Sequence, residues 1–275
     1  MVGKMTSLSE PAFELRDVTY RYGEVTALRG ISLTLRAGRR AVLLGANGCG
    51  KSTLLRLLDA LCFPAEGRLL FCGAPLSEEA LQDASFAFGF RRRVGFVFQN
   101  PDAQLFSPTV FDEVAFGPLQ LRLPRNEIRK RVMLALDLME ITHLRTRSPH
   151  HLSTGEKKRT ALASVLVLDP EILLLDEPTA SLDPKSESQM IDFLVGWRGG
   201  AKTVITATHD LGLIEDIADD CFVLQEGQLA AAGLPAEILA DTRLLEGASL
   251  LHAHRHTHAS GIMHSHPHLH QHEHP

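Results

Sequence analysis

The sequence predicts an α/β fold in which a parallel β-sheet is joined to an antiparallel β-subdomain and a helical subdomain. Three features predict this fold. They are a glycine-rich loop between an apolar strand and a helical segment, two continuous apolar runs at Ile172–Leu175 and Thr203–Ala207, and alternating apolar residues near the amino terminus. Continuous apolar runs are typical of parallel strands covered on both faces, whereas alternation is typical of strands with one solvent face.

The composition of the 275-residue chain excludes several classes of protein. With 44% hydrophobic and 22% charged residues it can bury a sizeable core, which excludes a disordered protein. Its 28 Lys and Arg against 33 Asp and Glu give a net charge of −5, so we expect no nucleic-acid partner. No apolar run reaches the roughly 18–20 residues of a spanning helix, and Met1–Pro11 shows no secretory signal. The scattered cysteines predict reduced thiols: Cys49, Cys62, Cys72 and Cys221.

The amino-terminal part of the chain predicts strands on either side of one helix. Apolar residues fall at roughly every second position in 13–20 and 31–35, which predicts two antiparallel strands. A short apolar strand at Arg40–Leu44 leads into the glycine-rich loop. Lys51–Leu61 then has the pattern of a helix, and Gly67–Cys72 predicts another strand.

The middle of the chain predicts a buried strand at Val94–Phe98 followed by helices. The charge run Arg91–Arg93 before this strand is expected at a solvated edge. From about residue 100 to 151 apolar residues such as Ile128 and Val132 recur at helical spacing. We interpret this stretch as the helical subdomain.

The end of the chain predicts a hairpin and then a tail. Cys221–Leu224 and Leu229–Ala232 are joined through Glu226-Gly227, which predicts two antiparallel strands that close the domain. We therefore assign a single α/β domain to residues 1–246 and a tail to residues 247–275. The low-complexity, His-rich composition of the tail predicts disorder.

The glycine-rich loop fits the pattern G-x-x-x-x-G-K-[ST] without a mismatch, and it lies between a predicted strand and a predicted helix, as this motif requires. Backbone N–H groups in such a loop surround phosphate oxygens, and the helix N-terminus adds positive potential. Lys51 would reach the β- and γ-phosphates of ATP, and the Ser52 hydroxyl would bind Mg²⁺. A thiol here can have a lowered pKa, but we expect Cys49 to be passive. The predicted ATP-binding residues of this loop are Gly45, Ala46, Asn47, Gly48, Cys49, Gly50, Lys51, Ser52 and Thr53.

A second motif ends the apolar run Ile172–Leu175 in two carboxylates, Asp176 and Glu177. An acidic residue after a strand is commonly a helix N-cap. Together with the phosphate-binding loop, however, the pattern predicts that Asp176 holds the Mg²⁺ shell and that Glu177 polarises the attacking water.

These motifs belong to a longer ordered series. The order resembles the ATP-binding subunits of ATP-binding-cassette (ABC) transporters over about residues 12–240, and it implies a P-loop NTPase fold. In this family the motifs are the Walker A loop, Q-loop, signature, Walker B strand, D-loop and H-loop. Here they are 45–52, Gln99, Leu152-Ser153-Thr154-Gly155-Glu156, 172–177, Ser181-Leu182-Asp183 and His209.

A narrower resemblance lies in the stretches Phe98–Phe106 and Val114–Pro118. They are similar to the ATPases of energy-coupling-factor (ECF) transporters, particularly those for cobalt and nickel.

The resemblance implies roles around one nucleotide. Gln99 would contact Mg²⁺ and water, and His209 would contact the γ-phosphate and position Glu177. Tyr22 would stack on adenine, with Tyr20 as the competing candidate.

The resemblance also implies a site shared between two chains. Ser153 and Gly155 would face the γ-phosphate held by the opposite subunit of a head-to-tail homodimer or paired ATPase, and Asp183 would help to build the seam. The family signature usually has Gly where this chain has Thr154, which puts the geometry of the shared site in question.

The tail alternates His with other residues. Alternate residues of an extended chain point to one side, so several imidazoles can converge on Ni²⁺ or Co²⁺, which imidazole suits. The alternative is that the tail is a solvated extension without a defined role. If the tail does bind metal, it could serve either as a metal sensor or as a metal buffer. The candidate ligands are His252, His254, His256, His258, His264, His266, His268, His270, His272 and His274.

Together these features predict an ATP-hydrolysing subunit that powers import of nickel or cobalt with integral-membrane subunits. Its place would be peripheral, on the cytoplasmic face of the cell membrane. The alternatives are the ATPase of a zinc importer or of a vitamin-type ECF transporter, and a soluble ABC ATPase. A vitamin transporter would not need the His tail. A zinc importer is not expected to carry the Phe98–Phe106 stretch.

Overall fold

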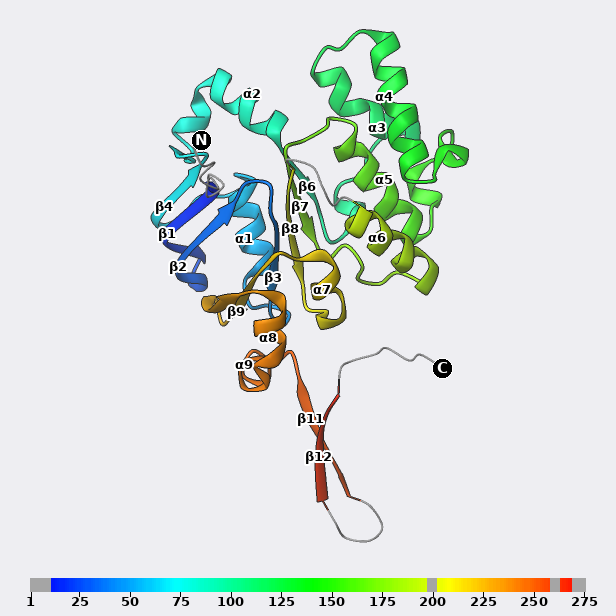
Figure 1. The fold of residues 1–275 in the computed structure, drawn as a ribbon. Helices are drawn as coiled ribbons and strands as arrows, with labels where there is room; N and C mark the ends of the chain where they lie inside the picture. The colour runs from blue at the N-terminus through cyan, green and yellow to red at the C-terminus, as the bar shows by residue number, and fades with distance from the viewer. Residues whose placement is uncertain (1–10, 197–201, 258–262, 269–275) are drawn as a thin grey trace, which may run out of the picture.

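The computed structural model describes residues 11–196, 202–257 and 263–268. Figure 1 shows three layers: a small antiparallel sheet on the left, a larger sheet in the centre and a group of helices on the right. The strands are β1 (Pro11–Tyr22), β2 (Val25–Arg36), β3 (Arg40–Leu44), β4 (Glu66–Phe71), β5 (Ala74–Pro75), β6 (Val94–Val97), β7 (Ile172–Asp176), β8 (Thr203–Thr208), β9 (Asp220–Gln225), β10 (Gln228–Gly233), β11 (His252–Thr257) and β12 (Met263–His268).

Helices lie between several of these strands. The α-helices are α1 (Lys51–Leu58), α2 (Ala84–Arg93), α3 (Val110–Gln120), α4 (Arg125–Leu138), α5 (Thr154–Leu166), α6 (Pro184–Gly196), α7 (Ile214–Ile217), α8 (Pro235–Ala240) and α9 (Thr242–Gly247). Short 3-10 helices lie at Ala80–Gln82, Pro101–Ala103, Thr142–Leu144, Pro149–His151 and Leu211–Leu213. Within the described part of the chain, every helix is too short or too polar to cross a lipid bilayer.

The larger sheet has the strand order β10-β9-β3-β8-β7-β6, and all its neighbours are parallel except β10 and β9. The position of β7 between two cores explains why its sequence is continuously apolar. Ile172 and Leu174 face a core shared with α1 and the antiparallel sheet, whereas Leu173 and Leu175 face a second core shared with the helical layer. Both faces of the strand are therefore buried, as the sequence predicts.

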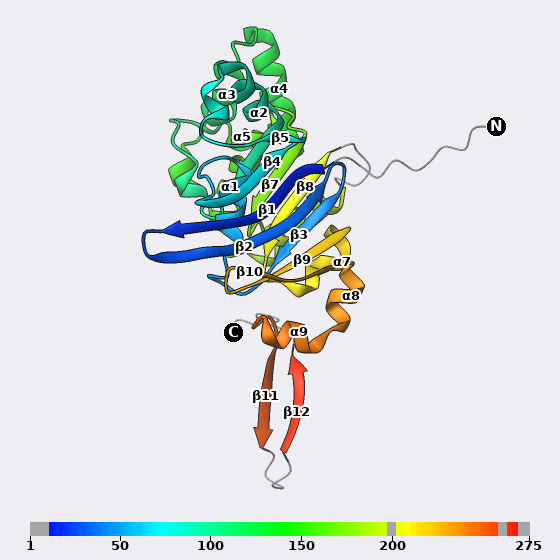
Figure 2. The same cartoon turned by 90° about the vertical axis from the view of Figure 1, so that its left-hand side faces the viewer.

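The antiparallel sheet has the order β2-β1-β4-β5. Strand β1 pairs with both β2 and β4, so that Phe13 lies opposite Leu35 on one side and Phe71 on the other. The Phe13 and Phe71 rings lie 5.3 Å apart between centroids. The two predicted strands before the glycine-rich loop are thus confirmed, and Figure 2 shows their hairpin projecting from the body.

The helical subdomain contains α3, α4 and the start of α5, which pack against one another. Val132 of α4 is fully buried, as its helical spacing predicts. The sequence does not predict α2, whose last turn contains the charge run Arg91–Arg93. Arg91 and Arg92 are exposed as expected, but Arg93 bonds Glu171 and lies 4.8 Å from the centre of the Phe71 ring. The Arg93 side chain is nevertheless 38% exposed, so the charge run lies at a solvated edge as expected.

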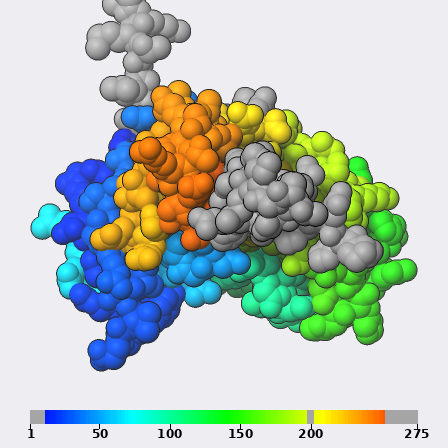
Figure 3. All heavy atoms as spheres, turned by 90° about the horizontal axis from the view of Figure 1, so that it is seen from below, coloured from blue at the N-terminus to red at the C-terminus, as the bar shows by residue number. Residues whose placement is uncertain are grey.

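The carboxyl-terminal region extends the fold beyond the predicted hairpin. Strands β9 and β10 form that hairpin, with left-handed backbone at both Glu226 and Gly227. Helices α8 and α9 follow and pack on the body, where Figure 3 shows them in orange. The core includes Leu250 and Leu251, which are only 8% and 9% exposed. Since buried side chains stabilise the domain, we expect its folded part to extend to about Leu251, beyond the predicted end at residue 246.

The tail contains two paired strands where its composition predicts disorder. Strands β11 and β12 are antiparallel and extend away from the body (Figure 2). The alternation of His with other residues has the period of a β-strand, which explains why a low-complexity segment can pair.

Candidate active site

The glycine-rich loop connects β3 to α1, as its motif requires. A Cβ atom on Gly45 would lie 2.4 Å from the Cys49 Sγ and 2.5 Å from the Leu224 backbone oxygen, so only glycine fits there. The β9–β10 turn braces the loop, because the Gly227 N–H donates to the Cys49 oxygen while its own oxygen accepts from the Arg29 N–H. The loop is therefore held in shape by distant segments of the chain.

A cavity of about 720 Å³ opens over this loop. This volume is in the range of pockets that hold a nucleotide-sized ligand. The cavity brings together three sequence-predicted motifs, since it is lined by residues of the loop, by the Q-loop glutamine and by the Walker B glutamate. Its lining residues are Tyr22, Val25, Thr26, Ala27, Arg29, Asn47, Gly48, Gly50, Lys51, Ser52, Thr53, Gln99, Glu177, Glu226 and Gly227.

Lys51 lies at the centre of the cavity floor and is 5% exposed. Its Nζ donates to the Gly45 oxygen at 2.6 Å and lies 3.3 Å from the Glu177 Oε1. A bound phosphate would compete with Glu177 for this ammonium group. In the free protein, the cation that binds phosphate is thus already paired with the predicted catalytic carboxylate.

An oxygen-rich group lies beside Lys51. The Ser52 hydroxyl donates to the Asp176 Oδ1 at 3.0 Å, and Gln99 lines the same cavity. Burial raises the pKa of Asp176, while the hydrogen bond from Ser52 acts in the opposite direction. Hydroxyl, carboxylate and amide oxygens are the ligands that Mg²⁺ prefers, and a divalent cation would relieve the buried charge. These three residues therefore fit the predicted magnesium site.

Glu177 directly follows β7 and is hydrogen-bonded to the neighbouring strand β8. Its backbone has a φ of 47°, and its N–H donates to the Ala207 oxygen at 2.9 Å. Its carboxylate, 5% exposed, lies 3.0 Å from the His209 Nδ1. Parallel neighbouring strands end at the same sheet edge, which explains why the residues after β7 and β8 meet there. A carboxylate held between a histidine and a lysine can orient and polarise water next to a bound phosphate.

The two tyrosines of β1 have different positions. Tyr22 is 44% exposed, lines the cavity and accepts a hydrogen bond from Arg56 at 3.2 Å. Tyr20 packs against the core, and burial raises its pKa. Tyr22 is therefore the tyrosine that can contact a base in the cavity.

Cys49 is not among the residues that line the cavity. It is 8% exposed, and burial raises the pKa of its thiol, against the lowering that a helix N-terminus can cause. All four cysteines are free.

The signature and D-loop residues lie outside the cavity of their own chain. Ser153 caps α5 by accepting from the Glu156 N–H, while the Glu156 carboxylate accepts from the Ser153 N–H. Asp183 caps α6, and a Cβ on Gly155 would lie 2.4 Å from the Ser186 Oγ. The two motifs are thus packed together but do not reach the phosphate-binding loop of the same chain.

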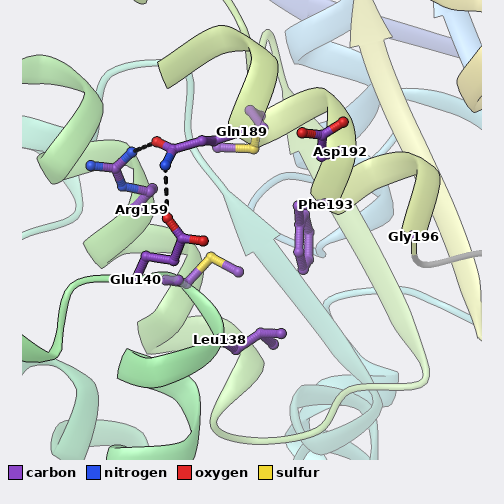
Figure 4. Close-up of a pocket in the computed structure, with 9 residues that line it drawn as sticks. Leu138, Glu140, Arg159, Gln189, Asp192, Phe193 and Gly196 are labelled. Atoms are coloured by element: carbon purple, nitrogen blue, oxygen red, sulfur yellow. Dashed lines mark hydrogen bonds between the residues drawn. The ribbon is translucent and has the colours of Figure 1, made fainter. Parts of the chain in front are cut away.

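Two further groups are not predicted by the sequence. Lys158 looks like a surface residue of a polar helix, yet it is 5% exposed and contacts the segment after β7. Arg159 and Gln189 line a second cavity, of about 480 Å³, between α4, α5 and α6 (Figure 4). It contains none of the predicted ATP-binding residues.

Comparison with known proteins places this site in a family. The model of the family described as ABC transporter matches residues 28–180. A nickel import ATP-binding protein, NikO, from Rhodobacter capsulatus is 57% identical over 244 residues, covering 88% of this chain and 96% of that protein. An energy-coupling factor transporter ATP-binding protein, EcfA, from Methanothermobacter thermautotrophicus is 44% identical over 238 residues, covering 86% and 75%.

A solved structure agrees with the sequence matches. The protein cbiO1 from Clostridium perfringens, described as part of the ABC transporter complex cbiONQ, has a TM-score of 0.74 and 38% sequence identity, covering 88% of this chain and 96% of that one. This chain belongs to the ABC transporter family, as an ATP-hydrolysing subunit. The predicted α/β fold with antiparallel and helical subdomains is confirmed.

Proposed function

We propose that this chain hydrolyses ATP to drive the import of nickel or cobalt ions. The 57% identity to a nickel import ATP-binding protein supports the metal, and the likeness to a part of the cbiONQ complex supports a multisubunit transporter. In this proposal the chain is a peripheral subunit on the cytoplasmic face of the cell membrane, and integral-membrane subunits carry the ion.

The observation that carries the proposal is the convergence of Lys51, Glu177 and His209 at one cavity. Lys51 binds the β- and γ-phosphates, Glu177 orients the attacking water, and His209 holds the Glu177 carboxylate. Ser52, Asp176 and Gln99 hold Mg²⁺, which supplies positive charge to the phosphates. Tyr22 contacts the adenine.

The active form is a head-to-tail homodimer. Ser153 and Asp183 are exposed and Gly155 is buried, and none of the three lines the cavity of its own chain. In the dimer they close the cavity of the partner subunit, where the N-terminus of α5 points its free N–H groups at the γ-phosphate. Thr154 adds a side chain at this helix end, so closure there differs from that of a Gly-Gly signature.

The integral-membrane partner contacts the segment that follows Gln99. Phe106 and Phe116 are 62% and 43% exposed, and their rings pack edge to face at 4.9 Å. The loop is held rigid, because the Phe106 N–H donates to the buried Glu113 carboxylate at 2.8 Å. An exposed aromatic pair on a rigid loop fits a helix of the membrane subunit. Because Gln99 begins this segment, contact there can follow the state of the nucleotide.

The tail binds Ni²⁺ or Co²⁺. The backbone register places histidines opposite one another at His252 and His268, His254 and His266, and His256 and His264. Directly opposite residues have Cβ atoms about 4.5–5.5 Å apart, and alternate positions share one face of the ribbon. Neighbouring pairs can therefore supply four imidazoles to one ion. His258, His270, His272 and His274 lie outside the described residues.

Calorimetry on two forms of the protein tests the tail. The full chain should bind several Ni²⁺ or Co²⁺ ions, and a chain ending at Leu251 should lose them. Binding should fall steeply below about pH 6, because only neutral imidazole binds metal and its pKa is about 6.5. A variant with Arg255→Ala and Ser265→Ala, which alters only positions between the histidines, should bind like the full chain. Equal metal stoichiometry in the shortened chain would exclude the tail as the metal site.

Uptake by the assembled transporter tests the function. The chain is produced together with its integral-membrane subunits, and membrane vesicles are loaded with ATP and given radioactive nickel, cobalt or zinc. Nickel or cobalt uptake should require ATP and should fall to background with Glu177→Gln. Uptake of zinc alone, or of none of the three ions by a complex that hydrolyses ATP, would show that the metal assignment is wrong.

A further inference from the structure

Lys158 is a buried cation that the proposed chemistry does not use. It lies one turn into α5 and is 5% exposed. Its Nζ donates three hydrogen bonds, at 2.8, 3.2 and 2.6 Å, to backbone oxygens of the segment after β7. The three acceptors are Glu177, Pro178 and Ala180. Three carbonyl groups of one short segment thus converge on a single ammonium group.

The segment that Lys158 holds, residues 177–180, begins with the catalytic carboxylate and leads into the D-loop. Glu177 and Ser181, at its two ends, have left-handed backbone with φ values of 47° and 61°. Residues with a side chain rarely adopt this conformation unless neighbouring groups enforce it. The local backbone bonds of the segment are two long ones, from the Ala180 N–H to the Glu177 oxygen at 3.2 Å and from the Leu182 N–H to the Thr179 oxygen at 3.3 Å. Lys158 therefore holds the backbone that carries Glu177, while His209 and Lys51 contact the carboxylate itself.

The ammonium group is charged at neutral pH. Burial lowers the pKa of Lys158 to about 8, while Glu177 and Asp176 act to raise it. Hydrogen bonds from a charged donor to carbonyl oxygens are stronger than those from a neutral donor. Replacing Lys158 by an apolar residue would leave three buried carbonyl oxygens without this donor.

Helix α5 joins this contact to the signature. Ser153 and Gly155 form its first turn, and Lys158 lies on the next turn. The following residue, Arg159, donates to Gln189, which in turn donates to Glu140 at 2.7 Å (Figure 4). Helix α5 therefore carries both the signature residues, which face the partner's nucleotide, and Lys158, which binds the segment after β7 at the nucleotide site of its own chain.

We propose that Lys158 is a positioning residue for ATP hydrolysis, which holds the 177–180 segment so that Glu177 stays directed at its own nucleotide. The same three hydrogen bonds join α5, which carries the signature, to the segment that carries Glu177. Movement of the signature toward the partner's nucleotide would therefore also affect the position of Glu177. This inference rests on the proposed role of Glu177 in hydrolysis.

Substitution of Lys158 by Met removes the donors and keeps an unbranched side chain that is only one atom shorter. Lys158→Met should lower kcat about 10-fold or more and change the KM for ATP less than about 3-fold, because Lys51 and Ser52 still bind the phosphates. Lys158→Arg keeps a charged donor and should recover part of the lost kcat. The matched control is Lys157→Met, which removes only the ion pair with Asp102 at 2.7 Å and should leave basal hydrolysis within about 2-fold. If Lys158→Met does not fold, Lys158→Gln, which keeps an N–H donor, replaces it.

A double-mutant cycle separates positioning from general stability. If Lys158 acts through Glu177, adding Lys158→Met to Glu177→Gln should lower the residual rate less than about 3-fold. Losses that multiply in the double variant, an unchanged kcat in the single variant, or a change in KM alone would each overturn the inference. If Glu177→Gln itself hydrolyses ATP at the wild-type rate, the proposed catalytic role of Glu177 fails instead.

Discussion

Replacing Glu177 by Gln removes a negative charge from the centre of the cavity and should have opposite effects on turnover and on ATP binding. The carboxylate lies 3.0 Å from the His209 Nδ1 and 3.3 Å from the Lys51 Nζ. An amide of the same shape cannot orient and polarise water as a carboxylate does. We therefore expect turnover to fall by a factor of about 10² or more.

Binding of ATP should become tighter in the same variant. Two unit charges 3.3 Å apart attract by roughly 5 kcal/mol at an effective dielectric constant of about 20. In the wild-type protein a γ-phosphate must share Lys51 with Glu177, and the two anions repel each other. In the wild-type protein, Lys51 loses its attraction to Glu177 on ATP binding but gains most of it back from the γ-phosphate. We therefore expect the Glu177→Gln variant to bind ATP more favourably by only about 1 kcal/mol, or roughly 5-fold in Kd.

Two measurements check this prediction. Single-turnover hydrolysis gives the rate, and titration with a fluorescent ATP analogue gives the Kd. Glu171→Gln is a matched control, because Glu171 precedes the same strand but is 59% exposed and pairs with Arg93. It should leave both quantities within about 2-fold. The reasoning is refuted if Glu177→Gln keeps more than half of the wild-type rate, or if it binds ATP more weakly than the wild-type protein.

Three further predictions concern stability. Asp59→Asn should stabilise the protein increasingly from about pH 4 to about pH 7, by at most about 1.4 kcal/mol per pH unit in urea unfolding. The reason is that burial raises the native pKa of Asp59 to about 7, so the wild-type protein loses stability as pH rises through this range. An equal pH dependence of stability in the two proteins would contradict this prediction. Leu174→Ala should cost about 2–5 kcal/mol because Leu174 is fully buried, whereas Leu134→Ala, at a site 59% exposed, should cost less than about 0.5; similar costs would refute the core assignment. A chain ending at Leu251 should keep the wild-type Tm, whereas one ending at Gly247 should melt lower, because it lacks the buried Leu250 and Leu251. Equal Tm values for the two shortened chains would favour the predicted boundary at residue 246.

Features that depend on neighbouring residues in the sequence are predictable. The phosphate-binding loop requires glycine at fixed positions, and the strand before Asp176 must be apolar on both faces because two cores meet there. The sequence therefore predicts the cavity floor and both carboxylates. Parallel strands then bring His209 to Glu177, although 32 residues separate them.

Features that depend on distant contacts are not predictable in this way. Helix α2 buries little more than Ala87 and Phe90, so it has no clear apolar period. Lys158 has the composition of a solvated helix face, and it is buried only because the segment after β7 folds over it. The packing of Leu250 and Leu251 into the core is not predicted, because these residues come directly before the His-rich tail. In each case the partner that decides the structure lies elsewhere in the chain.

The central claim is that each ATP site is built from two chains, and mixing two inactive variants tests it most directly. Lys51→Met disables the phosphate-binding loop. Ser153→Asp keeps a helix N-cap but places a negative charge toward the partner's phosphate.

In a mixed dimer of these variants, one site combines both defects and the other combines the intact loop with the intact signature. Light scattering of each variant first establishes that both chains still dimerise. Mixing should then restore ATP hydrolysis to about a quarter of the wild-type rate, because half of the dimers are mixed and each has one intact site of two. A mixture as inactive as its components would contradict the shared site.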